Sequence, residues 1–180
     1  MRAGRLPNTR PGRSAARCPQ PPLSEPANAT GITGVFVRPL QILPGERGAV
    51  MHMLRADAPH FERFGEIYFS VVNRGAVKAW RRHRSIVTNI AVPVGTIRVV
   101  LYDDRPDSAT RGAVVEIETG RDSYSLITIP AGIWNGFLGL GPEPAVVANC
   151  ATEPHDPAEV DRRPEDDADI PYTWGSRAGA

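Results

Sequence analysis

The fold of this chain is decided by residues 75–105, which read GAVKAWRRHRSIVTNIAVPVGTIRVVLYDDR. β-Branched Ile, Val and Thr alternate through this stretch, which is typical of pleated, half-buried strands. The same stretch carries a basic cluster of Lys78, Arg81, Arg82, His83 and Arg84. Cations that face a closed core are costly unless they meet an anion. The stretch therefore predicts the wall of a β-barrel whose interior is wet, polar and suited to something negatively charged.

Length and composition fit one domain. The chain has 180 residues and an ordinary apolar content, enough for a single core. No apolar run is long enough to span a bilayer, and we expect neither a membrane nor a nucleic acid as a partner. The two cysteines, Cys18 and Cys150, lie in unrelated contexts and indicate neither a disulfide framework nor a zinc motif. This cysteine usage favours the reducing cytoplasm.

The first thirty residues differ from the rest. They contain six prolines, and five arginines against the single acidic residue Glu25. Such a segment buries too little apolar surface to order itself, and its prolines disfavour an amphipathic transit helix. It has no apolar core of a secretory signal. Residues 1–30 are therefore predicted to be a disordered Arg/Pro-rich extension, or the product of an upstream start codon, and residues 31–180 to be the folded domain.

Beyond Thr30 the pattern is mostly β. Short strands separated by Gly, Pro, Asn and Asp turns are typical of a sandwich or barrel. The predicted strands are Gly34–Val37, Ala49–Leu54, Ile67–Val72, Ala76–Trp80, Ile86–Val92, Thr96–Asp103, Ala113–Glu118, Ser125–Ile129 and Ala145–Cys150. One short C-terminal helix is expected after Asp156, which can cap it, with Pro157 in its first turn. The acidic tail that follows is expected to dock on the barrel through Tyr172 and Trp174.

Several motifs occur in an order that resembles one known family. They are Gly75-Ala-Val-Lys-Ala-Trp80, Pro93-Val-Gly95, Val99–Asp103, Asp107–Gly112, Ile129–Phe137 and Pro154-His-Asp-Pro157. In this order they are similar to the dTDP-4-dehydrorhamnose 3,5-epimerase family, and to a subgroup with a Lys-x-Trp-x-x-His signature. The resemblance implies an all-β cupin, an antiparallel jelly-roll barrel that is usually a homodimer through exchanged N-terminal strands. It also implies that a nucleotide-diphospho-sugar binds at the barrel mouth and that stereocentres next to its 4-keto group are inverted.

The residues that the resemblance assigns to catalysis are replaced in this chain. In the family, a histidine paired with an aspartate is the base, a tyrosine is the acid, and a further histidine lies in the active site. These positions fall on Arg81, Val99, Asn149 and Asn135, respectively. An arginine stays protonated and cannot be the base. The resemblance therefore implies a divergent subgroup, in which Asn135 and Asn149 remain substrate-binding candidates.

Binding residues are better matched. Lys78 corresponds to a diphosphate-contacting residue of the family, and Arg81 would add a second charge, since a guanidinium suits phosphate oxygens. Glu66 and Tyr68 correspond to sugar- or base-contacting positions. Trp134 could stack on a sugar or base, or could simply pack in the core or a dimer interface. Strict alternation puts Lys78 and Arg81 on opposite faces, so both reach the cavity only if the strand bulges.

His83 is the remaining candidate for a catalytic base. It shares a face with Arg81, and the ordinary pKa of an imidazole suits proton transfer near neutrality. Arg81 beside it would lower the pKa of His83 and favour the neutral form. The alternative is a hydrogen-bonded structural histidine. His155 lies in a turn and is not counted in the site. With one histidine in the barrel, we expect no metal and no other cofactor.

Two functions stay open. The first is an isomerase that abstracts a proton next to the ketone of a dTDP-4-keto-6-deoxyhexose-like substrate, in deoxysugar or polysaccharide biosynthesis. The second is a catalytically inactive sugar-nucleotide-binding cupin that keeps only the phosphate-binding residues. The fold alone cannot choose between them, because cupins host many functions.

Overall fold

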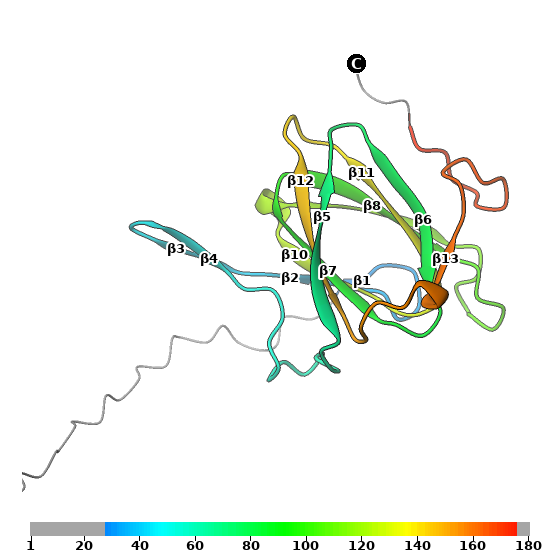
Figure 1. The fold of residues 1–180 in the computed structure, drawn as a ribbon, viewed down its shortest axis with the longest axis horizontal. Coiled ribbons are helices and arrows are strands. Elements are labelled where there is room, and N and C mark those ends of the chain that lie inside the picture. Colours follow the sequence, from blue (N-terminus) through cyan, green and yellow to red (C-terminus); the bar gives the residue numbers. More distant parts are fainter. Residues whose placement is uncertain (1–27, 176–180) are drawn as a thin grey trace, which may run out of the picture.

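Two antiparallel sheets packed face to face form the molecule (Figure 1). The computed structural model describes residues 28–175. The six-stranded sheet has the order β1-β2-β10-β7-β12-β5, and the five-stranded sheet has the order β13-β6-β11-β8-β9. This confirms the predicted all-β, cupin-type barrel. Residues 1–27 of the predicted extension lie outside the described residues. Its end, Asn28–Ala29, forms a short strand instead of belonging to the extension.

The strands are short, and most follow the predicted runs. The six-stranded sheet contains β1 (Asn28–Ala29), β2 (Phe36–Pro39), β10 (Ser125–Ile129), β7 (Thr88–Val94), β12 (Ala145–Ala151) and β5 (Glu66–Val72). The five-stranded sheet contains β13 (Val160–Arg162), β6 (Val77–His83), β11 (Ile133–Gly139), β8 (Thr96–Asp103) and β9 (Val114–Gly120). A separate hairpin of β3 (Ile42–Gly45) and β4 (Gly48–Met51) projects away from the barrel (Figure 1). A 3-10 turn, η1, spans Arg121–Ser123.

The core lies between the sheets and draws heavily on residues 75–105. Alternate residues of β7 and β8 point inward, which is the period-2 pattern that the sequence shows. Ile90, Val92, Ile97, Val99 and Leu101 are all buried in one cluster with Ile127 and Phe137. Val99 is thus a core residue, packed among aliphatic side chains.

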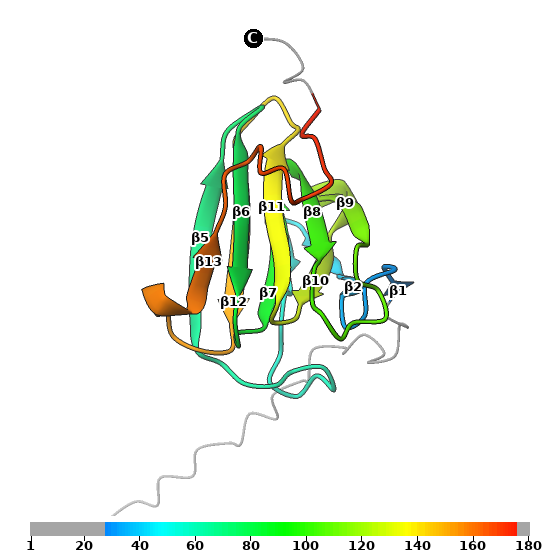
Figure 2. The ribbon, with the colours of Figure 1, turned by 90° about the vertical axis from the view of Figure 1, so that its right-hand side faces the viewer.

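The outer face of the five-stranded sheet is covered by the C-terminal segment, which crosses β6 and β11 (Figure 2). Ile170, Tyr172 and Trp174 pack against Trp80. The ring centroid of Trp80 lies 6.0 Å from that of Tyr172 and 4.9 Å from that of Trp174. The predicted docking of the tail is therefore confirmed.

The expected C-terminal helix is wrong. Asp156 does cap this segment, because its Oδ1 accepts a hydrogen bond from Ala158 N at 2.9 Å. The turn is only the three-residue 3-10 helix η2 (Pro157–Glu159), and the chain then pairs with β6 as β13. So short a segment cannot offset the cost of helix nucleation, and β-branched Val160 suits a strand. In residues 28–175 we find no helix that could cross a membrane.

A β-bulge interrupts β6. Arg81 pairs with Asn135 on β11, but the next pair joins Lys78 to Phe137, so three steps on β6 face two on β11. Phe137 points into the core, and Lys78 therefore shares the inner side of the strand with Arg81. The predicted condition for placing both cations on one face is met.

Candidate functional site

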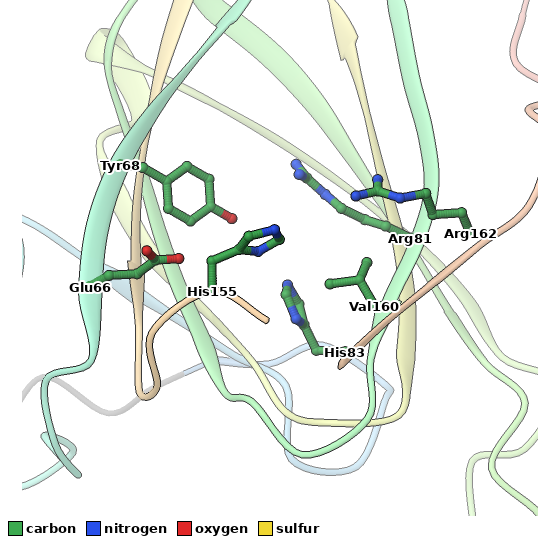
Figure 3. Close-up of a pocket in the computed structure, with 7 residues that line it drawn as sticks. All are labelled: Glu66, Tyr68, Arg81, His83, His155, Val160 and Arg162. Atoms are coloured by element: carbon green, nitrogen blue, oxygen red, sulfur yellow. The ribbon is translucent and has the colours of Figure 1, made fainter. Parts of the chain in front are cut away.

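A pocket of about 350 Å³ opens between β5 of one sheet and β6 and β13 of the other (Figure 3). The segment between β12 and η2 closes one side. Seven residues line the pocket: Glu66, Tyr68, Arg81, His83, His155, Val160 and Arg162. Six of them carry ionisable side chains, and four of those six were predicted site residues.

Strand β6 aims two nitrogen-bearing side chains into the pocket. Arg81 and His83 are two residues apart, so both project from the inner face. Arg81 Nη2 and His83 Nδ1 are buried, and neither finds a hydrogen-bond partner within the part of the chain that the structure describes. Buried polar atoms are normally paired, so unpaired polar atoms that line a pocket indicate a ligand site.

Burial governs the ionisation of these two groups. It lowers the pKa of Arg81, an effect that Tyr68 opposes and Arg162 reinforces, although a guanidinium remains charged. Burial, followed by the charge of Arg81, also lowers the pKa of His83, and Glu159 only partly offsets this. His83 is therefore a neutral imidazole at neutral pH, in the form that can accept a proton.

Strand β5 forms the opposite wall. Its pleat sends Glu66 and Tyr68 inward and leaves Ile67 and Phe69 exposed on the outside. In Figure 3 the Tyr68 hydroxyl and the Glu66 carboxylate both project from β5 into the pocket. The structure thus brings together Glu66, Tyr68, Arg81 and His83, as the sequence predicted. Their roles stay predictions.

The two asparagines do not line the pocket, but they support the strands that do. Asn135 is buried, and its Nδ2 donates to the main-chain oxygen of Arg81 at 3.1 Å. Asn149 is also buried, and its Nδ2 donates to the main-chain oxygens of Val147 at 3.0 Å and Tyr68 at 3.3 Å. Both amides therefore serve the backbone of pocket strands.

Lys78 lies on the inner side of β6 but outside the pocket lining. Its side chain is exposed, and Nζ donates to the main-chain oxygen of Val71 on β5 at 3.3 Å. The lysine thus bridges the two strands that form the pocket walls, one bulge away from Arg81. Its predicted contact with a diphosphate stays a prediction.

Trp134 lies on the outer face of the five-stranded sheet, away from the pocket. Its Nε1 donates to Asp104 Oδ2 at 2.8 Å. The guanidinium carbons of Arg82 and Arg163 lie 4.5 and 4.7 Å from the centroid of its ring. The structure therefore does not bring Trp134 to the other predicted site residues, because strand alternation turns it outward from its neighbour Asn135.

Three pocket residues were missed in the sequence: Val160, His155 and Arg162. His155 reaches the pocket from the segment after β12, and Arg162 reaches it from β13. Arg162 carried no signal, because β13 is a three-residue strand after an acidic turn. His155 belongs to the motif Pro154-His-Asp-Pro157, which could have drawn attention to it. Both are brought in by long-range pairing of the C-terminal segment with β6.

Comparisons with known proteins identify one family. Residues 29–179 match the family model described as dTDP-4-dehydrorhamnose 3,5-epimerase. The chain is 36% identical over 149 residues to the probable low-salt glycan biosynthesis epimerase Agl13 of Haloferax volcanii, covering 81% of this chain and 96% of that one. It is 32% identical over 147 residues to the spore coat polysaccharide biosynthesis protein SpsL of Bacillus subtilis, covering 81% and 97%.

A solved structure is similar as well. The dTDP sugar isomerase from Desulfovibrio desulfuricans G20 superposes with a TM-score of 0.82 at 46% sequence identity, covering 83% of this chain and 96% of that one. The family match spans almost all of the described barrel, including every strand of the pocket. This chain therefore belongs to the dTDP-4-dehydrorhamnose 3,5-epimerase family.

Proposed function

We propose that this protein is a nucleotide-sugar isomerase that acts on a dTDP-4-keto-6-deoxyhexose-like substrate, with His83 as the base. Family membership supports an epimerase of glycan or polysaccharide biosynthesis, and homologues bind dTDP-sugars. One observation carries the proposal: the His83 imidazole and the Arg81 guanidinium line one pocket, and each has a buried nitrogen with no hydrogen-bond partner among residues 28–175.

The chemistry follows from these side chains. A neutral His83 can remove a proton from the carbon next to a ketone. Arg81 and Arg162 supply fixed positive charge to the same pocket, which suits the anionic diphosphate of a sugar nucleotide. The charge that develops on the ketone oxygen is stabilised in the same positive field. Base and binding groups thus come from two neighbouring strands, β6 and β13.

The protein is also proposed to be a homodimer. β5 is the edge strand of the six-stranded sheet, and its outer residues Ile67, Phe69 and Val71 are 51%, 64% and 57% exposed. An edge strand with a contiguous apolar face is normally covered by a partner. Sedimentation velocity should show a dimer, and Phe69→Glu should convert it to a monomer. A monomeric wild-type protein would contradict this part of the proposal.

The second candidate, a catalytically inactive sugar-nucleotide-binding cupin, is favoured by one observation. The amides of Asn135 and Asn149 are engaged by the main chain, so neither position supplies a proton-transfer group. In that case Arg81, Arg162 and His83 only bind the nucleotide sugar.

The experiment that separates the two is incubation with dTDP-4-keto-6-deoxyglucose in D2O, followed by NMR. The isomerase incorporates deuterium at C3 or C5, and His83→Asn abolishes this incorporation. The matched control is His52→Asn, because His52 does not line the pocket. Absence of exchange together with a rise in melting temperature on adding dTDP would leave the inactive binder. Absence of both effects would overturn both candidates.

A further inference from the structure

We propose that Tyr68 is the catalytic acid that returns the proton on the face of the sugar opposite His83. This inference rests on the proposed function. Inverting a carbon centre next to a ketone requires a base on one face and a proton donor on the other. A single base that returns its own proton restores the original configuration. The pocket must therefore offer a second proton-transfer group across from His83.

The pocket contains three such groups besides His83, namely Glu66, Tyr68 and His155. Arg81 and Arg162 do not qualify, since a guanidinium does not release its proton at useful pH. His83 projects from β6 of the five-stranded sheet. Glu66 and Tyr68 project from β5 of the six-stranded sheet, which is the facing wall (Figure 3). The donor is therefore to be sought on β5 or on the segment that carries His155.

Tyr68 is the group whose placement fits. His155 is exposed and lies in the segment between β12 and η2. Glu66 is the first residue of β5, at the end of this wall. Tyr68 stands two residues further along the strand, and its ring extends the hydroxyl toward the interior, between the two walls (Figure 3). A phenol is also a hydrogen-bond donor at neutral pH, as the group that delivers a proton must be.

The surroundings of Tyr68 support proton donation. The phenolate form of Tyr68 raises the pKa of Arg81 against the effect of burial, so the phenol oxygen and the guanidinium lie within electrostatic reach. As the proton leaves Tyr68, the negative charge on its oxygen is stabilised by this buried cation. The charge of Arg81 thus acts on both proposed proton-transfer groups, since it also acts on His83.

Asn149 acts as a positioning residue for Tyr68. The two residues are cross-strand partners on β12 and β5. Asn149 Nδ2 donates to the main-chain oxygen of Tyr68 at 3.3 Å and to Ser70 Oγ at 3.3 Å. These bonds fix the segment of β5 from which the phenol projects. A donor on a braced strand is held more firmly than one on a loop.

The step balances without an oxidant or reductant. The His83 imidazole takes the proton from the carbon next to the ketone, and the electrons of the broken C–H bond form the enolate. The Tyr68 O–H bond then breaks, and its proton forms a new C–H bond on the opposite face as the ketone returns. The imidazolium and phenolate that remain are reset by proton exchange with water at the mouth, beside His155. The net result is inversion of one centre.

The test compares two readouts in Tyr68→Phe, with dTDP-4-keto-6-deoxyglucose in D2O. Proton exchange reports the base, and NMR coupling constants at C3 and C5 report inversion. Inversion is expected to fall on the order of 100-fold or more, the usual contribution of one acid–base group. Deuterium incorporation without inversion should persist within a few-fold, because His83 still removes and returns a proton. His83→Asn should lose both readouts.

The control is Tyr102→Phe, because Tyr102 packs on the outer cluster around Trp80 and not in the pocket. It should leave both readouts unchanged. If Tyr68→Phe inverts the substrate at the wild-type rate, the inference is wrong while the proposed function stands. If exchange and inversion fall together with a raised KM, Tyr68 only binds substrate, and the inference is again wrong. A wild-type protein with neither exchange nor inversion would overturn the proposed function itself.

Discussion

Two clusters of buried charge in this barrel differ in whether their buried atoms have hydrogen-bond partners. Around Asp103, which is fully buried, both carboxylate oxygens are paired. Oδ1 accepts from Arg105 Nε at 2.8 Å, while Oδ2 accepts from Ser108 Oγ at 2.6 Å and Thr110 Oγ1 at 2.7 Å. In the pocket, buried nitrogens of Arg81 and His83 have no partner among residues 28–175. One cluster is closed by the chain, and the other is open to a ligand.

Ionisation follows this difference. Burial alone would raise the pKa of Asp103, but the hydrogen bonds from Arg105, Ser108 and Thr110 outweigh it and lower that pKa. No such bonds compensate Arg81 and His83, whose pKa values burial lowers. The carboxylate that shapes the 104–112 loop is thus satisfied internally, whereas the buried nitrogens of Arg81 and His83 find no partner among residues 28–175. In this barrel, the burial of a charged side chain indicates a functional site only where its hydrogen-bond partners are missing.

The largest effect should come from breaking the closed cluster. Asp103→Asn leaves the partly buried Arg105 without its anion and should lower the free energy of unfolding by about 3 kcal/mol, measured in urea. Because the pKa of Asp103 is lowered on folding, its contribution exists above about pH 4 and is lost as the pH falls below that value. Glu118→Gln, in the exposed pair with Arg98, should cost less than about 1 kcal/mol. Equal losses in the two variants would contradict the comparison.

The open cluster should respond with the opposite sign. Arg81→Met removes a half-buried guanidinium that lies over the Phe137 ring and has no ion-pair partner among residues 28–175, so the free energy of unfolding without ligand should hold or rise. Affinity for dTDP should fall roughly 10- to 100-fold in calorimetry, the equivalent of one charged hydrogen bond. The matched control is Arg82→Met, the next residue on the outer face, which pairs with Asp104 and Asp161. That variant should lose stability and keep its affinity, and the reverse pattern would sink the assignment.

A smaller effect is expected at Trp134. Trp134→Phe loses the hydrogen bond to Asp104 and should lower the free energy of unfolding by about 1 kcal/mol. Affinity for dTDP and dTDP-sugars should be unchanged, because the ring lies outside the pocket. A clear loss of affinity in the folded variant would show that the stacking role suggested by the sequence is right after all.

The smallest effect is a pH dependence at His83. Its pKa is lower folded than unfolded, so between the folded pKa and about 6.5 the unfolded chain binds the extra proton. The contribution of His83 to stability is therefore complete above about pH 6.5 and declines as the pH falls. The difference in melting temperature between wild type and His83→Gln should shrink or change sign from pH 8 to pH 5. His52→Gln is the control, because His52 lies outside the pocket. An identical pH profile for wild type and His83→Gln would contradict the assignment.

The sequence predicted the fold well where alternation is regular. The bounds of β8 and β10 agree with the predicted strands, and β7 differs by two residues at each end. β11 was missed because Asn135, Gly136 and Gly139 interrupt its apolar pattern, although it lies at the centre of the five-stranded sheet. β13 was missed because so short a strand exists only through its pairing with β6. Local pattern finds strands, but it does not report tertiary pairing.

The same limit applies to the site. Arg81 and His83 could be predicted because they lie two apart on one strand, and Glu66 and Tyr68 because the resemblance assigned them. Trp134 could not be placed, because the side of β11 that it occupies depends on a strand that had not been identified. Arg162 reaches the pocket only after the C-terminal segment folds back over more than seventy residues of sequence. Side chains that converge from distant segments leave no local signal.

The bulge in β6 decides what the deletion of one residue does to this strand. With one extra residue between Lys78 and Arg81, the two halves of the strand follow opposite odd–even frames. The half that ends at His83 can vary its inward residues while Arg82 keeps its outward ion pairs. Loss of the extra residue would remove the bulge and leave Lys78, Arg81 and His83 on one face in regular alternation, whereas loss of a residue beyond the bulge, such as Arg82, would turn His83 outward. Beyond the bulge, a one-residue deletion therefore changes which side chains face the pocket, whereas in a loop it changes only the length.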